Sequence, residues 1–89
     1  MNRYEYKYEV VRKKKAYARK MMGLPKSVEV KHKDMPEWQR KHRLYLEICE
    51  QILICEELAC PLSKEMIMEL CEMETISQIQ RYCRKVKIA

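Results

Sequence analysis

One stretch of the sequence, residues 35–59, most constrains what this chain can fold into, because it is the longest run compatible with a single helix. Its apolar residues recur at a helical spacing and not at the alternating spacing of a strand. They are Trp38, Tyr45, Ile48, Cys49, Ile52, Cys55 and Ala59. Leu53 and Ile54 widen this stripe until most of the circumference is apolar. A helix of that kind needs neighbours on several sides, so the stretch is predicted to be the core helix.

Local signals mark both ends of this helix. Asp34 precedes it and Glu37 follows three residues later, which is the reciprocal capping arrangement that satisfies backbone N–H groups at a helix start. Pro61 lies just beyond residue 59 and has no amide hydrogen with which to continue the helix. The helix is therefore predicted to begin at residue 35 and to end before Pro61.

The rest of the chain is also predicted to be helical. One Gly and three Pro among 89 residues leave little material for the tight hairpins of a many-stranded sheet. We predict a single all-α domain, a small four-helix bundle with helices over about 3–22, 35–59, 64–73 and 76–87. Two alternatives stay open, a strand over residues 3–10, where tyrosines alternate, and an extended segment over residues 27–31.

Turn and capping residues support the other helix limits. Gly23 suits a left-handed position that ends the first helix. Ser63 is a favourable N-cap for the third, and Thr75 with Gln78 has the capping-box spacing for the fourth. The predicted core consists of these residues: Trp38, Tyr45, Ile48, Ile52 and Leu58, packed against Val10, Tyr17, Met21, Ile67, Leu70, Ile79 and Tyr82.

The five cysteines indicate reduced, buried thiols in a cytoplasmic protein. They are odd in number, form no C-x-x-C pair and fall mostly at apolar helix positions. Neither they nor His32 and His42 have the close spacing of a structural zinc site, so no metal and no cofactor is predicted. The N-terminal residues lack the apolar core of a signal peptide, and no apolar run approaches the roughly 20 residues of a membrane span.

Charge is distributed unevenly along the chain, whose formal net charge is +6. The N-terminal half is basic, residues 46–79 contain eight acidic residues and one basic residue, and residues 80–89 are basic again. These segments could simply be solvated or pair with each other. A binding surface is the favoured interpretation, because consecutive basic residues on one helix repel each other without a structural benefit. The candidate nucleic-acid or partner contacts are Arg12, Lys13, Lys14, Lys15, Arg19, Lys20, Arg40, Lys41, Arg43, Arg81, Arg84 and Lys85.

The last two predicted helices resemble a helix-turn-helix in outline. Residues 75–81 include Ser, Gln and Arg, which are side chains that contact bases and phosphates. The turn has no Gly, however, and three glutamates would lie near the DNA: Glu69, Glu72 and Glu74. A plain helical hairpin is therefore the favoured interpretation.

No motif for catalysis is present. The sequence has no G-x-S-x-G, no glycine-rich phosphate loop and no H-E-x-x-H. His42 and Cys49 form a nucleophile–base pair in residue type only, and a buried, inert thiol explains Cys49 better. We therefore expect a small non-enzymatic binding protein that binds nucleic acid through its N-terminal basic face. The alternative is a protein-interaction module, including an inhibitor or adaptor of nucleic-acid machinery of the kind that phages and mobile elements encode, and a homo-oligomer is also compatible.

Overall fold

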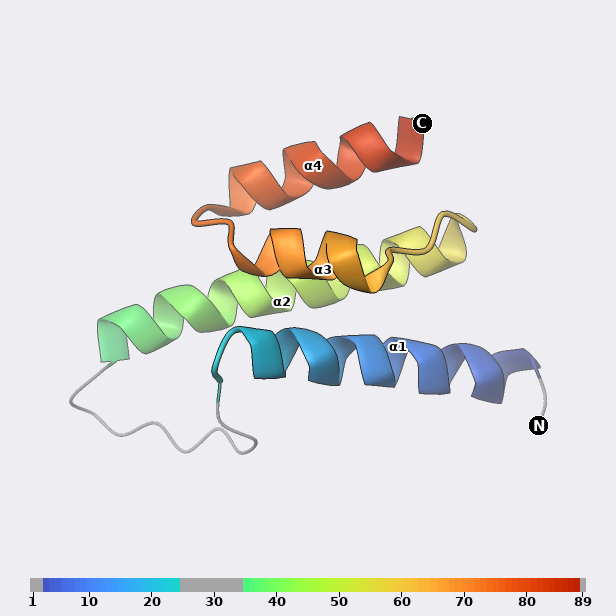
Figure 1. The fold of residues 1–89 in the computed structure, drawn as a ribbon, viewed down its shortest axis with the longest axis horizontal. Helices are drawn as coiled ribbons and strands as arrows, with labels where there is room; N and C mark the ends of the chain where they lie inside the picture. The colour runs from blue at the N-terminus through green and yellow to red at the C-terminus, as the bar shows by residue number, and fades with distance from the viewer. Residues whose placement is uncertain (1–2, 25–34, 89) are drawn as a thin grey trace.

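The fold is an all-α bundle, as the sequence predicted (Figure 1). The computed structural model describes residues 3–24 and 35–88. Its helices are α1 (Arg3–Met21), α2 (Met35–Glu57), α3 (Lys64–Cys71) and α4 (Ile76–Ile88). Since α1 covers residues 3–10, the alternative of a strand there is wrong. The proposed Asp34 cap and the extended segment at 27–31 lie outside the described residues, as does the side chain of Trp38.

Each helix runs opposite to the one before it, and α2 is the common neighbour of the other three (Figure 1). α1 lies along one side of α2 and α4 along the other, while α3 packs against both α1 and α2. The Cα atoms span 42 × 31 × 17 Å, so the bundle is a slab with two broad faces. α1 and α4 therefore form opposite edges of the slab.

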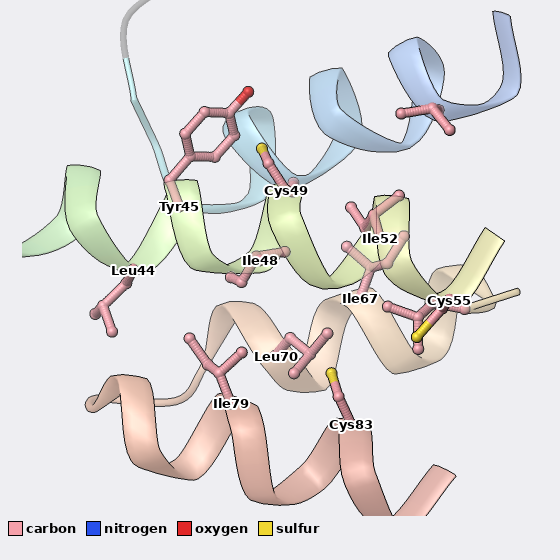
Figure 2. Close-up of a cluster of buried hydrophobic side chains, with 13 residues drawn as sticks. Leu44, Tyr45, Ile48, Cys49, Ile52, Cys55, Ile67, Leu70, Ile79 and Cys83 are labelled. Atoms are coloured by element: carbon pink, nitrogen blue, oxygen red, sulfur yellow. The ribbon is translucent and has the colours of Figure 1, made fainter. Parts of the chain in front are cut away.

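The core lies where the inner sides of the helices meet α2 (Figure 2). Tyr45 and Cys49 point from α2 toward α1, whereas Ile48 points toward α3 and α4. The prediction of a central helix with neighbours on several sides is thus confirmed. The large side chains that are less than 2% exposed are Ile48, Ile52, Leu62, Ile67, Leu70, Ile79, Cys55 and Cys83.

The inward side of α1 differs from the predicted one. Met21 is 45% exposed and was wrongly assigned to the core, while Val11 and Ala18, seven residues apart, are buried. The reason is steric, because Ala18 has almost no side chain and lets α1 approach α3 closely. The Cys71 Sγ lies 3.7 Å from the Ala18 carbonyl oxygen. A small residue therefore selects which of two neighbouring apolar edges of α1 enters the core.

The end of α2 also differs from the prediction. The helix ends at Glu57, and Ala59 adopts the left-handed φ of 59°. The Cys60 amide donates to the Cys55 carbonyl at 2.9 Å, and the Ala59 amide donates to the Glu56 carbonyl at 3.3 Å, which together form a Schellman turn. Because the chain turns away here, Leu58 is 56% exposed and does not join the core. α1 ends in the same kind of turn, with the predicted Gly23 at φ 71°.

The predicted caps of α3 and α4 are confirmed. The Ser63 Oγ accepts a hydrogen bond from the Met66 amide at 3.3 Å. The Thr75 Oγ1 accepts from the Gln78 amide, and the Gln78 Oε1 accepts in return from the Thr75 amide, both at 3.2 Å. This reciprocal pair fixes where α4 begins, and so fixes which of its residues face outward.

Candidate functional site

The basic run of α1 does not form one surface, because several of its side chains have partners within the fold. The Lys14 ammonium forms an ion pair with the Glu56 carboxylate of α2, and the two side chains are only 19% and 14% exposed. The Arg19 guanidinium lies over the ring of Tyr45, 5.0 Å from its centroid. These two cations attach α1 to α2.

The remaining basic residues of α1 point in several directions. Arg12 is largely exposed and pairs with Glu9 at 3.0 Å on its own helix. Lys15 is half-buried, while Lys13 and Lys20 are exposed and lie seven residues apart on one side of α1. The run of four consecutive basic residues is therefore divided around the helix, at about 100° per residue. Lys13 and Lys20 are therefore the bases of the predicted α1 run that lie exposed together on one side of the helix.

The basic residues at the start of α2 are placed more openly. Arg40 and Arg43 are exposed and Lys41 is half-buried. The Arg40 guanidinium lies 3.9 Å from the Glu37 carboxylate, one turn earlier and also exposed. Such a surface pair is weak, so it leaves Arg40 able to reorient toward another anion.

α4 separates its two sides sharply. Ile79 and Cys83 are fully buried against the core, with Tyr82 and Val86 partly buried beside them. The opposite side exposes Ser77, Arg81, Arg84 and Lys85. No acidic residue occurs anywhere in α4, so these charges have no carboxylate on their own helix. α4 is therefore the helix whose basic residues project together.

A hollow of about 350 Å³ joins the start of α4 to the start of α2. Arg40 and Arg43 line it from α2, and Ser77, one turn before Arg81, lines it from α4. Exposed bases thus line the α2 side of this hollow and continue along α4 beyond it. We call them the α4 basic surface: Arg40, Arg43, Arg81, Arg84 and Lys85. Glu74 also lines the hollow and limits its positive charge.

A chain of polar side chains fixes α4 on α2. The Lys87 ammonium donates to the Gln51 Oε1 at 3.0 Å, and the Gln51 Nε2 donates to the Glu47 Oε1 at 3.1 Å. The Gln80 Nε2 donates to the same Glu47 oxygen at 3.1 Å. Gln51 is only 7% exposed, so its amide depends on these partners. Lys87 thus belongs to the packing of α4 and not to its outward surface.

Burial favours the protonated form of four thiols. Burial raises the pKa of Cys71 and of Cys83 to about 11, and it also raises the pKa of Cys49 and of Cys55. A thiol rather than a thiolate is a poor nucleophile and a poor metal ligand. Within residues 3–24 and 35–88, no three His, Cys, Asp or Glu side chains gather as metal ligands. No helix in those ranges is long and apolar enough to cross a membrane.

Comparison of the chain with models of known protein families, with curated protein sequences and with solved structures gives no match.

The basic residues that the sequence predicted as one N-terminal face are grouped differently in the structure. It brings Arg40 and Arg43 close to the start of α4, which sequence separation gave no signal for. It also places α1 and α4 on opposite edges of the slab, with α2 between them (Figure 1). The helix-turn-helix interpretation is weakened further, because α3 exposes Glu65, Glu69 and Glu72 and runs antiparallel to α4 (Figure 1).

Proposed function

We propose that this protein is a non-enzymatic nucleic-acid-binding protein and that the α4 basic surface makes the contact. The observation that carries the proposal is the charge of α4, which exposes Arg81, Arg84 and Lys85 on one side and has no acidic residue. Phosphate backbones bind such clusters because each contact releases condensed counterions. The N-terminal basic face is a weaker candidate, since Lys14 and Arg19 are engaged within the fold.

The contacts are expected to be mainly to phosphates and to depend little on base sequence. The Gln78 Oε1 and the Thr75 Oγ1 already accept backbone hydrogen bonds at the start of α4, so these base-reading side chains are occupied. Arg81 and Arg84 form no ion pair with the described residues 3–24 and 35–88, and their planar guanidinium forks suit phosphate oxygens. A surface of this composition gives affinity and orientation rather than sequence recognition.

Titration of labelled duplex and single-stranded oligonucleotides at several salt concentrations tests this function. We expect the logarithm of the binding constant to fall linearly with the logarithm of salt concentration, with a slope of about −0.9 for each phosphate contact to duplex DNA. The variant Arg81→Ala/Arg84→Ala should reduce the magnitude of that slope by about 2, because it removes two contacts.

The matched control is Lys13→Ala/Lys20→Ala, which removes the same charge from the exposed side of α1. It is expected to change affinity much less than the α4 variant. Equal losses from both variants would show that only net charge matters and would contradict a defined surface. Absence of binding at low salt would reject the function itself.

A protein partner is the second candidate, favoured by one observation. Tyr8 and Leu53 are 70% and 44% exposed beside a groove between α1 and α2. If a protein partner binds in that groove, substitution of Tyr8 and Leu53 should abolish the effect of the protein in cells. The variant Arg81→Ala/Arg84→Ala should then leave that effect unchanged.

A further inference from the structure

The face of the slab opposite α3 contains a groove of about 530 Å³ between α1 and the C-terminal half of α2. Val11 forms part of its lining, with Tyr8 and Leu53. Leu53 lies on the opposite side of α2 from Ile48, which packs toward α3, so α3 does not cover it. Two large apolar side chains are thus exposed at one place, beside a depression.

The two sides of this groove have opposite charge. The α1 side is lined by Lys7, Arg12 and Lys15, and no acidic side chain of α1 lines it. The α2 side is lined by Glu56 and Glu57. Glu56 is engaged by Lys14, but Glu57 is exposed.

The exposed side of α2 continues this pattern toward its middle. Glu50 lies two turns before Glu57 and is also exposed, and Leu46 lies two turns before Leu53 with 52% of its surface exposed. The face is therefore a strip of exposed apolar residues with basic side chains along α1 and acidic side chains along α2.

A face of this kind is complementary to itself. Half a turn about an axis parallel to the helices lays α1 of one copy over α2 of the other, so bases meet acids on both sides of the axis. Half a turn about an axis that lies in the face but is perpendicular to the helices lays α1 of one copy over α1 of the other, so like charges oppose each other. Only one two-fold arrangement is therefore electrostatically favourable.

We infer that this face is the contact surface of a symmetric homodimer, in which the α1 bases of each copy pair with Glu50 and Glu57 of the other around a centre formed by Tyr8 and Leu53. A second copy of this chain already carries the complementary charges, so no assumption about the sequence of a different partner is needed. A uniformly acidic partner would be repelled by the α2 side, and a uniformly basic one by the α1 side. The broad face, 42 × 31 Å between Cα atoms, is large enough for a standard interface of roughly 800 Å² per partner.

Size-exclusion chromatography with light scattering on the full chain tests this inference. The wild-type protein should have twice the chain mass of 10.9 kDa. The variants Lys7→Glu/Arg12→Glu and Glu50→Lys/Glu57→Lys should each be monomeric, because each makes both sides of the groove alike in charge. Mixed in equal amounts, the two variants should restore the dimer mass, since acids then face bases on both sides. Helical circular dichroism of each variant separates loss of the dimer from loss of the fold.

Arg84→Glu/Lys85→Glu is the matched control, with the same kind of change on α4. It should remain dimeric while losing nucleic-acid binding, so failure of the dimer and failure of the proposed function are distinguishable. A wild-type mass of 10.9 kDa would overturn the inference and leave the groove for a different protein. A dimer that survives both groove variants, or a mixture that stays monomeric, would overturn it as well.

Discussion

α1 and α4 are both basic helices packed along α2, yet they use their charge differently. α1 carries more basic residues, but Lys14 pairs with Glu56 and Arg19 lies over Tyr45. α4 commits one base, Lys87, to its packing and exposes Arg81, Arg84 and Lys85 together. The density of charge in a sequence is therefore a poor guide to where charge projects, because packing decides which cations have partners.

The difference has a physical cause in what each helix packs against. The side of α2 next to α1 includes Glu56, whose carboxylate is mostly buried and needs a cation. The side of α2 next to α4 offers amide and carboxylate groups that Gln80 and Lys87 satisfy. The outward arginines of α4 are thus not required by its packing.

Replacing Lys14 tests the structural role of the α1 bases and should have the largest effect. Lys14→Ala leaves the Glu56 carboxylate mostly buried without its cation, so the free energy of unfolding should fall by about 2 kcal/mol in urea denaturation. The neighbouring exposed substitution Lys13→Ala should change it by less than about 0.5 kcal/mol.

Double substitution sharpens that result. Lys14→Ala/Glu56→Gln removes both charges and should recover part of the lost stability, because no buried carboxylate is then unpaired. Equal stability of the Lys13→Ala and Lys14→Ala variants would remove the contrast between α1 and α4.

Lys87 should behave like the bases of α1 although it lies on α4. Lys87→Met removes the donor to the Gln51 Oε1, so stability should fall by about 1 kcal/mol with little change in nucleic-acid affinity. Lys85→Met should do the opposite, weakening binding at unchanged stability. If both variants affect binding equally, the division between packing and outward bases on α4 is wrong.

The packing of α4 should also make stability depend on pH. Burial raises the pKa of Cys83 on α4 from 9.0 to about 11, and a hydrogen bond to the Glu69 carboxylate raises that of Tyr82 from 10.0 to about 12. Folding favours the protonated forms, so their contribution to stability is complete below pH 9.0 and is lost as pH rises toward 11 and 12. Urea midpoints should therefore fall over this range.

Cys83→Ala provides the control for the pH effect. It should lower stability at neutral pH through the cavity it leaves, and it should flatten the decline between pH 9.0 and 11. If the loss of stability with rising pH is the same in Cys83→Ala as in the wild type, groups other than Cys83 cause it. Cys71, whose Sγ lies against the Ala18 carbonyl oxygen of α1 and whose pKa is also raised to about 11, should account for part of the decline that remains.

Much of the fold could be predicted because its signals are local. Caps at Ser63 and Thr75 and the turn at Gly23 depend on hydrogen bonds within a few residues. The apolar spacing of α2 identified Ile48 and Ile52 as core residues for the same reason. The choice of Val11 and Ala18 over Met21 was not predictable, since it depends on how closely α3 approaches α1.

The sequence by itself determined the helices, their caps and the residues available for charge. Only the tertiary structure decided which charges reach the surface together. Lys14 and Glu56 are 42 residues apart, and Arg43 and Ser77, which line one hollow, lie on different helices. Helix formation depends on neighbours along the chain, whereas the pairing and exposure of charge depend on neighbours that packing alone brings together.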